Sequence, residues 1–252
     1  MALSAYDKLH MLHRCWRLRF KSEVASIQYV RDAKLLGATV LDIGANKGVF
    51  SIYLSRAAGP DGKLISFEAQ PELGAHLSAV KKSFSLDNMT LVNKGLSSGA
   101  GVLTMRRTEA GSGMAGFHHA AGEGLDEIDI PVIKLDDYVT EHHPGPIRFI
   151  KCDVEGHELP VFQGAAEMLR RDLPTLLFEC HDAEAESGEL FEFLVDLGYD
   201  GFFYHVRPAD HGSWTHKGRG EFVHYSEYAE REHVHPDVHH RNFIFVKKGS
   251  EP

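Results

Sequence analysis

The stretch from Val40 to Gly48 constrains the fold more than any other part of the sequence. Three apolar residues surround a single acid, Asp42, and the glycines Gly44 and Gly48 follow. An amphipathic run begins directly afterwards at Val49. The pattern predicts a buried strand, a tight glycine turn and the first turn of a helix. Glycines let the backbone approach a bound group, and a helix start offers unpaired N–H groups to it.

Asp42 distinguishes this turn from a phosphate-binding loop. The dinucleotide fingerprint needs glycines at 44, 46 and 49, whereas this chain has Gly44, Asn46 and Val49. A carboxylate two residues before the first glycine would repel a pyrophosphate. It suits a ligand that bears an ammonium group and hydroxyls, such as S-adenosylmethionine. A solvated acid in an ordinary turn is the alternative that this stretch leaves open.

Acids also follow three later predicted strands. The strand 63–68 ends in Glu68, where an acid in nucleotide-binding α/β folds accepts hydrogen bonds from ribose hydroxyls. The strands 147–152 and 175–178 end in clusters that comprise Lys151, Asp153, Glu155, His157, Glu179 and His181. Ligands bind at the carboxyl ends of the strands in open α/β sheets. We therefore expect these side chains to lie along one edge of the sheet.

Strands alternate with helices along the chain, which indicates an α/β fold with one doubly wound, mostly parallel sheet. No linker or repeat divides the sequence, so a single domain over residues 1–252 is expected. Residues 1–37 are predicted as a helical extension, with a second helix over 23–36. Further short strands are predicted at 89–92, 101–106 and 128–133, and a helix opens at Pro160 and carries Leu169. Residues 205–241 form a polar, histidine-rich loop before the last strand.

The first predicted helix has apolar residues at helical spacing, namely Leu9, Leu12, Trp16 and Phe20. Five lysines and arginines lie between positions 8 and 21. We expect the apolar face to pack on the edge of the domain with its charges in solvent. A helix that binds a membrane surface or a partner is the alternative.

Composition narrows the function classes. The net charge of −9 argues against broad nucleic-acid binding, which needs a basic surface. No run approaches the length of a membrane span, and no signal peptide is visible. Three cysteines, Cys15, Cys152 and Cys180, form no disulfide framework, so a cytoplasmic setting is expected. The pair His235 and His239 has helical metal-ligand spacing, but Pro236 between them argues against zinc.

Four motifs occur in order: Asp42-x-Gly-x-Asn-x-Gly48, Phe67-Glu-x-x-Pro71, Leu135-Asp-Asp137 and Lys151-x-Asp-x-Glu-Gly-x-Glu158. With these motifs the chain resembles the FkbM-type methyltransferase family over roughly residues 38–182. The resemblance implies a Rossmann-like fold with seven strands, the last one antiparallel, that binds S-adenosylmethionine. It also implies O-methylation of a hydroxyl on a sugar, glycan or natural product. His157 departs from the small residue that is usual there.

The resemblance also implies roles for individual residues. The methionine part of the cofactor would be lined by Asp42, Gly44, Asn46 and Gly48. Glu68 would hold the ribose hydroxyls, and Ser97 would lie near the adenine. The acceptor is a small molecule or glycan whose identity no motif encodes, and oligomeric state has no sequence signal either.

Methyl transfer to a hydroxyl needs a base near the methyl group, because an alcohol is a poor nucleophile until it loses its proton. The candidates are Asp153, Glu155, His157, Glu179 and His181, with Lys151 beside the carboxylates as an ion-pair partner. His157 titrates nearest neutral pH, although a surface histidine at a helix start would have the same sequence. The same carboxylates and histidines suit Mg²⁺ or Mn²⁺, so a divalent cation is considered without an assigned site.

Two other functions compete with this interpretation. A nicotinamide-dependent oxidoreductase is disfavoured by Asn46 in place of glycine and by the acid at Asp42. A non-catalytic cofactor- or glycan-binding module of the same fold is disfavoured by the intact acids Asp42, Glu68 and Asp153, since a decayed site would be expected to lose some.

Overall fold

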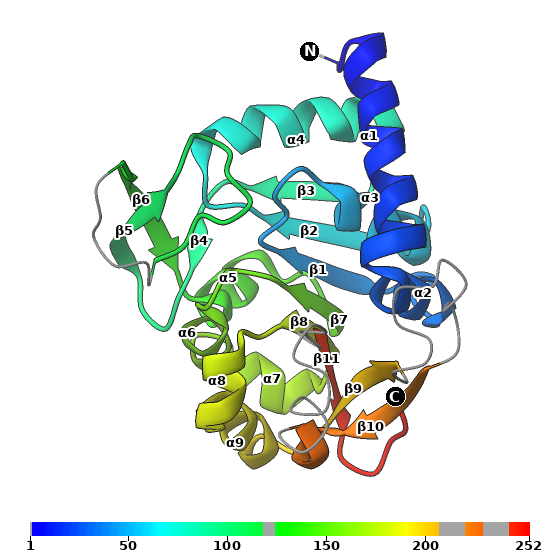
Figure 1. Ribbon diagram of the computed structural model, residues 1–252, viewed down its shortest axis with the longest axis vertical. Coiled ribbons are helices and arrows are strands. Elements are labelled where there is room, and N and C mark those ends of the chain that lie inside the picture. Colours follow the sequence, from blue (N-terminus) through cyan, green and yellow to red (C-terminus); the bar gives the residue numbers. More distant parts are fainter. Residues whose placement is uncertain (1, 118–123, 207–219, 229–241) are drawn as a thin grey trace.

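A central eight-stranded sheet with helices on both faces forms the body of the protein (Figure 1). The computed structural model describes residues 2–117, 124–206, 220–228 and 242–252, with backbone only at 182 and 183. In spatial order the strands are β10 (Gly220–His224), β9 (Tyr199–Val206), β11 (Asn242–Lys247), β8 (Thr175–Glu179), β7 (Ile147–Cys152), β1 (Thr39–Ile43), β2 (Lys63–Phe67) and β3 (Met89–Val92).

The five strands from β8 to β3 run parallel, and β11 pairs antiparallel with both β8 and β9. This is the expected Rossmann-like arrangement with an antiparallel last strand, so the predicted fold class is confirmed. The eighth strand is β10, which adds an edge to the seven that were expected. All parallel strands end at one edge of the sheet, where the predicted site residues follow them.

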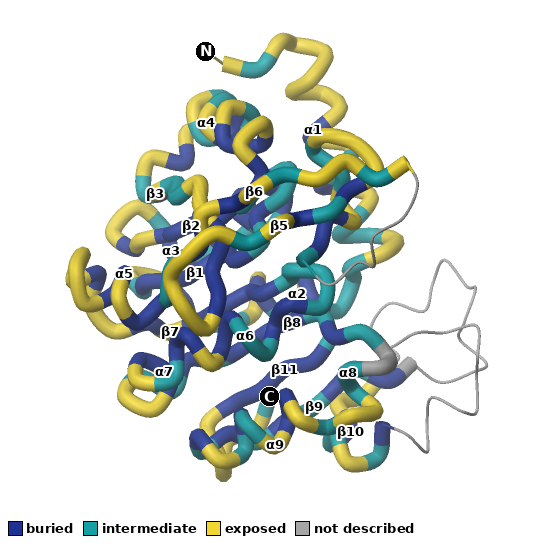
Figure 2. The backbone as a smooth tube through the Cα atoms, turned by 90° about the vertical axis from the view of Figure 1, so that its left-hand side faces the viewer, coloured by how far each residue is buried: buried dark blue, intermediate teal, exposed yellow. Residues whose placement is uncertain are grey.

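Side chains alternate between the two faces of the sheet and join two separate cores. In β1, Leu41 and Ile43 belong to one core cluster, whereas Val40 belongs to the other. The first cluster is covered by α5 (Leu135–His142), α6 (Glu158–Gln163), α7 (Ala166–Asp172) and α9 (Glu189–Asp196). The second is covered by α1 (Ala5–Arg17), α2 (Val24–Asp32), α3 (Val49–Ala58) and α4 (Pro71–Phe84). Figure 2 shows the central strands buried and the helices exposed on their outer sides.

Two of the predicted strands form a second sheet with β4 (Gly95–Leu96). They are β5 (Gly101–Arg107) and β6 (Asp126–Ile133), which pair antiparallel with each other. Their alternating polar and apolar residues are typical of an antiparallel pair with one solvated face. A central strand of the main sheet would be apolar on both faces, so the alternation places these two strands outside it.

The predicted loop over residues 205–241 is wrong where the structure describes it. β9 continues to Val206, and β10 returns antiparallel beside it, with the Phe222 ring 5.3 Å from the Tyr204 ring. A 3₁₀ turn follows at Tyr225–Glu227. The rest of that segment, including His235 and His239, lies outside the described residues.

Three helical expectations need correction. The helix predicted over 23–36 ends at Asp32. The helix predicted to open at Pro160 begins at Glu158 and is interrupted at Gly164 and Ala165, which separate α6 from α7. Gly164 lies so close to the Ser97 carbonyl that a side chain there would collide with it. In α1, Met11 and Cys15 are buried, and the face that carries Leu9, Leu12 and Trp16 is exposed. Among the described residues, no helix has the length and apolar character needed to cross a bilayer.

Candidate active site

The turn after β1 is shaped by three residues with positive φ. Gly44, Asn46 and Gly48 have φ of 77°, 48° and 83°. A side chain at Gly44 would collide with the Asp153 carbonyl at the end of β7, so only glycine allows the two strand ends to approach so closely. Gly48 is the N-cap of α3. The turn therefore opens the helix N-terminus beside the end of β7.

Asp42 lies on the α3 face of β1 and is almost fully buried. The Ser51 hydroxyl, from the first turn of α3, donates a hydrogen bond to its carboxyl Oδ2. Burial raises the pKa of Asp42 to about 6, against the lowering effects of Ser51 and Lys151. The contacts with Ser51 and Lys151 therefore do not fully offset the cost of burying the Asp42 carboxylate. A cationic ligand group could offset the rest.

Glu68 follows β2 and is buried at the same edge. Its two carboxyl oxygens accept backbone hydrogen bonds from Asn46 (2.7 Å) and Gln70 (2.9 Å). Burial raises its pKa to about 7, although these two N–H groups act in the opposite direction. The hydrogen bonds fix the direction of the carboxyl and leave it further lone pairs to accept from hydroxyl groups.

Lys151 is a fully buried cation among several acids. Its Nζ lies 3.2 Å from Asp153 Oδ2 and 5.0 Å from the Phe50 ring. Burial alone would lower the pKa of Lys151, but the carboxyls of Asp153, Glu23 and Glu179 outweigh burial and raise it. Lys151 is therefore charged, and it holds the strand-end acids together as their counter-ion.

Glu23, which sequence reasoning missed, joins this cluster from the start of α2. Its carboxyl accepts a hydrogen bond from the Asn242 amide of β11 (3.2 Å). Burial raises its pKa to about 7, against the lowering effect of Lys151. The only sequence signal for this residue was an acid between two helical patterns. Nothing local connects it to strand ends that follow more than a hundred residues later.

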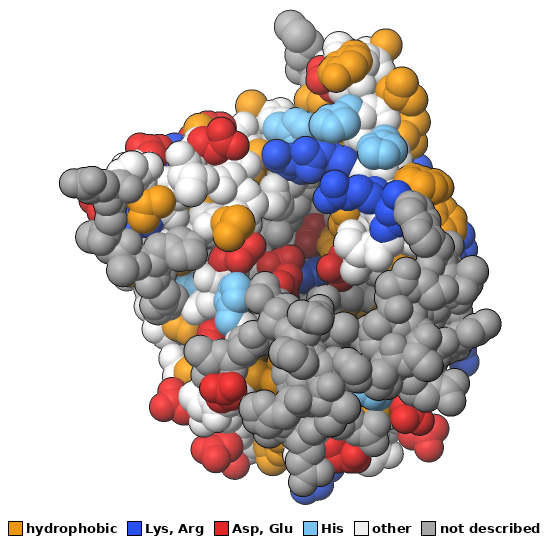
Figure 3. Space-filling model, viewed as in Figure 1, with side chains coloured by type: hydrophobic (Ala, Val, Ile, Leu, Met, Phe, Trp, Pro, Cys, Tyr) orange, Lys and Arg blue, Asp and Glu red, His pale blue; other side chains and the backbone are white. Residues whose placement is uncertain are grey.

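Two cavities meet at the strand ends and share Gly44, Asn46 and Asp153 among their walls. One, of about 80 Å³, lies on the Glu68 side, and the other, of about 250 Å³, on the Asp42 side. Asn46 Oδ1 is buried between them without a hydrogen-bond partner. In Figure 3 acidic side chains and a basic one form the floor of a hollow at this place. The two cavities are two ends of one cleft.

The second sheet supplies a wall of this cleft that the sequence did not reveal. Apolar side chains of Leu96, Met105 and Phe117 line the cavity on the Glu68 side. Gln70 ties the loop after β5 to this wall, because its amide donates to the Ser112 carbonyl (2.9 Å) and accepts from the Gly111 N–H (3.0 Å). The result is an apolar slot beside a buried acid, which fits a flat ring attached to a hydroxylated group.

The remaining candidates separate into two groups. Glu155 lines the cleft, and its Oε2 lies 3.5 Å from His181 Nε2. His157 is buried instead of lying at the surface, with Nε2 3.0 Å from the Ser97 hydroxyl. Neither Ser97 nor His157 is among the residues that line the two cavities. Glu155 is therefore the one of these side chains that lines the cleft. His181 contacts Glu155 without forming part of either cavity wall, and His157 is turned toward Ser97.

The carboxylates and histidines do not converge as a metal site in the described part of the chain. No three His, Cys, Asp or Glu side chains there are arranged to hold an ion. His157, which was considered as a ligand beside Asp153 and Glu155, is directed at Ser97. The described geometry gives no donor set to which a cation could be assigned.

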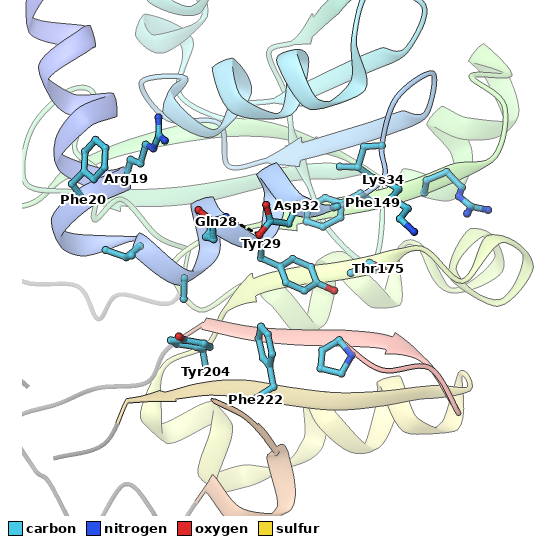
Figure 4. Close-up of a pocket in the computed structure, with 16 residues that line it drawn as sticks. Arg19, Phe20, Gln28, Tyr29, Asp32, Lys34, Phe149, Thr175, Tyr204 and Phe222 are labelled. Atoms are coloured by element: carbon cyan, nitrogen blue, oxygen red, sulfur yellow. Dashed lines mark hydrogen bonds between the residues drawn. The ribbon is translucent and has the colours of Figure 1, made fainter. Parts of the chain in front are cut away.

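A larger cavity, of about 900 Å³, lies elsewhere, between α2 and the β9–β10 hairpin. In Figure 4 Tyr29 of α2 and the pair Tyr204 and Phe222 of the hairpin face each other across it. Its sheet wall includes Arg148 and Thr175, close to the amino ends of β7 and β8. None of the predicted site residues lines this cavity. Size alone therefore does not mark the site, and the strand-end cleft with its buried acids remains the candidate.

The family model of the methyltransferase FkbM domain matches residues 42–200, which begins at Asp42 and takes in the strand-end acids from Glu68 to Glu179. The chain belongs to the FkbM methyltransferase family. It is therefore a methyltransferase of the S-adenosylmethionine-dependent class, as the resemblance implied.

One similar protein is itself called a methyltransferase, and two solved structures share the fold. Methyltransferase sdnD of Sordaria araneosa is 26% identical over 190 residues, which cover 64% of this chain and 73% of that protein. The structure of the FkbM methyltransferase from Methylobacillus flagellatus has a TM-score of 0.54 at 16% identity. The match covers 92% of this chain and 48% of that one, so this chain spans about half its length. A putative rRNA methylase from Clostridium thermocellum has a TM-score of 0.50 at 13% identity, over 92% and 97% of the two chains.

Proposed function

We propose that the protein transfers the methyl group of S-adenosylmethionine to a hydroxyl oxygen of a sugar, glycan or glycosylated natural product. The observation that carries this proposal is the cleft in which Asp42, Glu68 and Asp153 meet at the ends of β1, β2 and β7. Membership of the family does not specify the acceptor, so the hydroxyl acceptor is the part that we propose. Its support is the carboxylate–histidine pair Glu155 and His181 beside the cofactor cleft.

The cleft fits the cofactor in three parts. Asp42, Gly44, Asn46 and Gly48 would surround the methionine part, with the partner-less Asn46 Oδ1 as an acceptor for its ammonium group. Glu68 would hold the ribose hydroxyls. The adenine would lie in the apolar slot of Leu96, Met105 and Phe117, because the apolar lining of that cavity suits a flat ring. Ser97 would support that wall from behind through its bond to His157.

When bound, S-adenosylmethionine supplies a sulfonium methyl group for in-line attack by oxygen. The chain must orient the acceptor and remove its proton. Asp153 is engaged in an ion pair with Lys151, whose Nζ lies 3.2 Å from its Oδ2, and we assign Asp153 to positioning. We assign proton removal to the Glu155–His181 pair, in which the carboxylate contacts the imidazole. Glu179 would act indirectly, through the charge of Lys151.

We also propose that residues 1–252 act as one domain, since Met11 and Cys15 of α1 share a core cluster with Val40 of β1. The three cysteines are buried free thiols, which supports a reducing cytoplasmic setting.

The proposal is tested by incubating the protein with methyl-labelled S-adenosylmethionine and a panel of sugars and glycosides that bear free hydroxyls. We expect label in an acceptor, with the new methyl bonded to oxygen by NMR. EDTA should leave the rate unchanged, because this route uses no cation. Methyl transfer to nitrogen or carbon, or a rate that EDTA abolishes and Mg²⁺ restores, would contradict the proposed chemistry.

Two variants test the proposed base. Glu155→Gln and His181→Asn should each lower turnover by roughly 10²–10⁴-fold and leave cofactor affinity within a few-fold. The pair Asp200 and His224, whose atoms Oδ1 and Nε2 lie 2.8 Å apart outside the cleft, provides the control. His224→Asn should keep normal turnover. Equal losses in both histidine variants would show that the effect is structural.

A further inference from the structure

The outer face of α1 presents a row of exposed apolar side chains. Leu9, Leu12 and Trp16 are 67%, 47% and 47% exposed, and Tyr6, one turn earlier, is 77% exposed. Intervals of three and four residues place the first three on one side of the helix, opposite the buried Met11. We call Leu9, Leu12 and Trp16 the α1 stripe. Figure 3 shows hydrophobic side chains along the outer edge of this helix.

Basic residues accompany the α1 stripe. At 3.6 residues per turn, Lys8 and Arg17 fall on opposite sides of it. The π-helical turn that follows (Leu18–Ser22) adds Arg19 and Lys21, and the Lys21 ammonium lies 5.3 Å from the Trp16 ring. Asp7 is the one acid between residues 5 and 22, whereas the whole chain has a net charge of −9. The exposed apolar residues of α1 are therefore flanked by positive charges, although the protein as a whole is acidic.

We propose that α1 docks on an anionic membrane surface, with the α1 stripe at the boundary of the acyl chains and the flanking cations among the head groups. Helices that lie in this interface combine an apolar face that includes tryptophan with lysines and arginines beside it. Each cation near an anionic leaflet adds attraction that falls off within a Debye length.

The charges favour a membrane over a second copy of this chain. Symmetric pairing of the α1 stripe with itself would bring the cations of two helices together, with one acid on each helix to compensate them. Lipid head groups supply the missing negative charge. The inner side of the same helix carries Arg14, which lines the cleft on the Asp42 side. A docked α1 therefore holds the cleft about one helix diameter, roughly 10 Å, from the surface.

The test is co-sedimentation of the full chain with vesicles of phosphatidylcholine, with and without phosphatidylglycerol. We expect binding to the anionic vesicles, weakened at high salt, and little binding to the neutral ones. The double variant Leu9→Glu/Leu12→Glu should bind at least about tenfold less tightly, because it removes apolar area and adds negative charge. The matched control is Val102→Glu, at a residue of β5 that is 64% exposed, and it should bind nearly as well as the wild type.

A second readout reports whether the stripe itself enters the lipid. In a Trp214→Phe background, Trp16 fluorescence should shift to shorter wavelength when anionic vesicles are added. Absence of binding to these vesicles, or equal binding by the Leu9→Glu/Leu12→Glu variant, would overturn the proposal. A wild-type dimer in light scattering that the same variant converts to a monomer would also overturn it, because the stripe would then be a contact between protein chains.

Discussion

At the scale of single residues, buried ionisable groups set the chemistry of the cleft. Asp42, Glu68 and Glu23 are carboxyls whose pKa values burial raises to about 6, 7 and 7. Lys151 balances part of this negative charge at the centre of the strand ends. Before the cofactor binds, the cleft therefore holds carboxyls that are partly protonated near neutral pH and ready to ionise when a cation arrives.

Cofactor binding should therefore release protons. The ammonium and sulfonium groups stabilise the ionised form of Asp42, so binding lowers its pKa and affinity rises with pH from about 5 to 7. Each group alone changes affinity by up to about tenfold per pH unit below its pKa. Calorimetry in buffers of different ionisation enthalpy measures the released protons. Asp42→Asn should reduce both the proton release and the pH slope. A flat affinity profile over this range would show that the carboxyls are already ionised.

We expect Lys151 to stabilise the folded protein, and to contribute more to the free energy of unfolding at high pH than at low pH. In Lys151→Met, Asp153, Glu23 and Glu179 lose their counter-ion, at a cost of about 3–5 kcal/mol. Because the raised pKa of Glu23 lets it take up a proton as pH falls, the loss in free energy of unfolding should be larger at pH 8 than at pH 5. Denaturant titrations at the two pH values measure this, with the exposed lysine variant Lys82→Met as control. An equal loss at both pH values would contradict the electrostatic explanation.

At the scale of elements, the second sheet completes the cleft. β5 and β6 hold the loop after Arg107 against the turn that follows β2, and Gln70 makes the connection. The sequence predicted strands β5 and β6 but not that they form a separate sheet beside the cleft. Strand patterns report which face of a strand is apolar, whereas the contact between Gln70 and Ser112 joins residues 42 positions apart and has no local signal.

Removal of this connection should weaken cofactor binding without loss of the fold. Gln70→Ala deletes the side chain that forms hydrogen bonds with Gly111 and Ser112, so the loop is held less firmly. We expect the free energy of cofactor binding to weaken by about 1–2 kcal/mol, which is roughly 5–30-fold in affinity. Thr104→Ala, which deletes an exposed hydrogen bond to Asp129 on the same sheet, is the control and should bind normally. An unchanged affinity in Gln70→Ala would mean that the loop does not contact the cofactor.

At the scale of the whole molecule, residues from both termini converge on one sheet edge. Strand-end acids were predictable, because an apolar run with an acid and a nearby glycine at its end occurs at both Asp42 and Asp153. The place of Glu23 at the cleft was not predictable, because it depends on how the start of α2 packs against β11. The orientation of α1 was predicted wrongly. Apolar spacing gives the period of a helix, whereas the choice of buried face depends on the shape of the surface it packs on.

The account rests on the claim that the strand-end cleft binds S-adenosylmethionine, and equilibrium calorimetry with the purified wild-type chain tests it most directly. We predict that S-adenosylmethionine and S-adenosylhomocysteine each bind at one site, that Asp42→Ala weakens the former by at least about tenfold, and that NAD does not bind. Binding of NAD, or no binding of either sulfur ligand to the folded wild-type protein, would contradict the account.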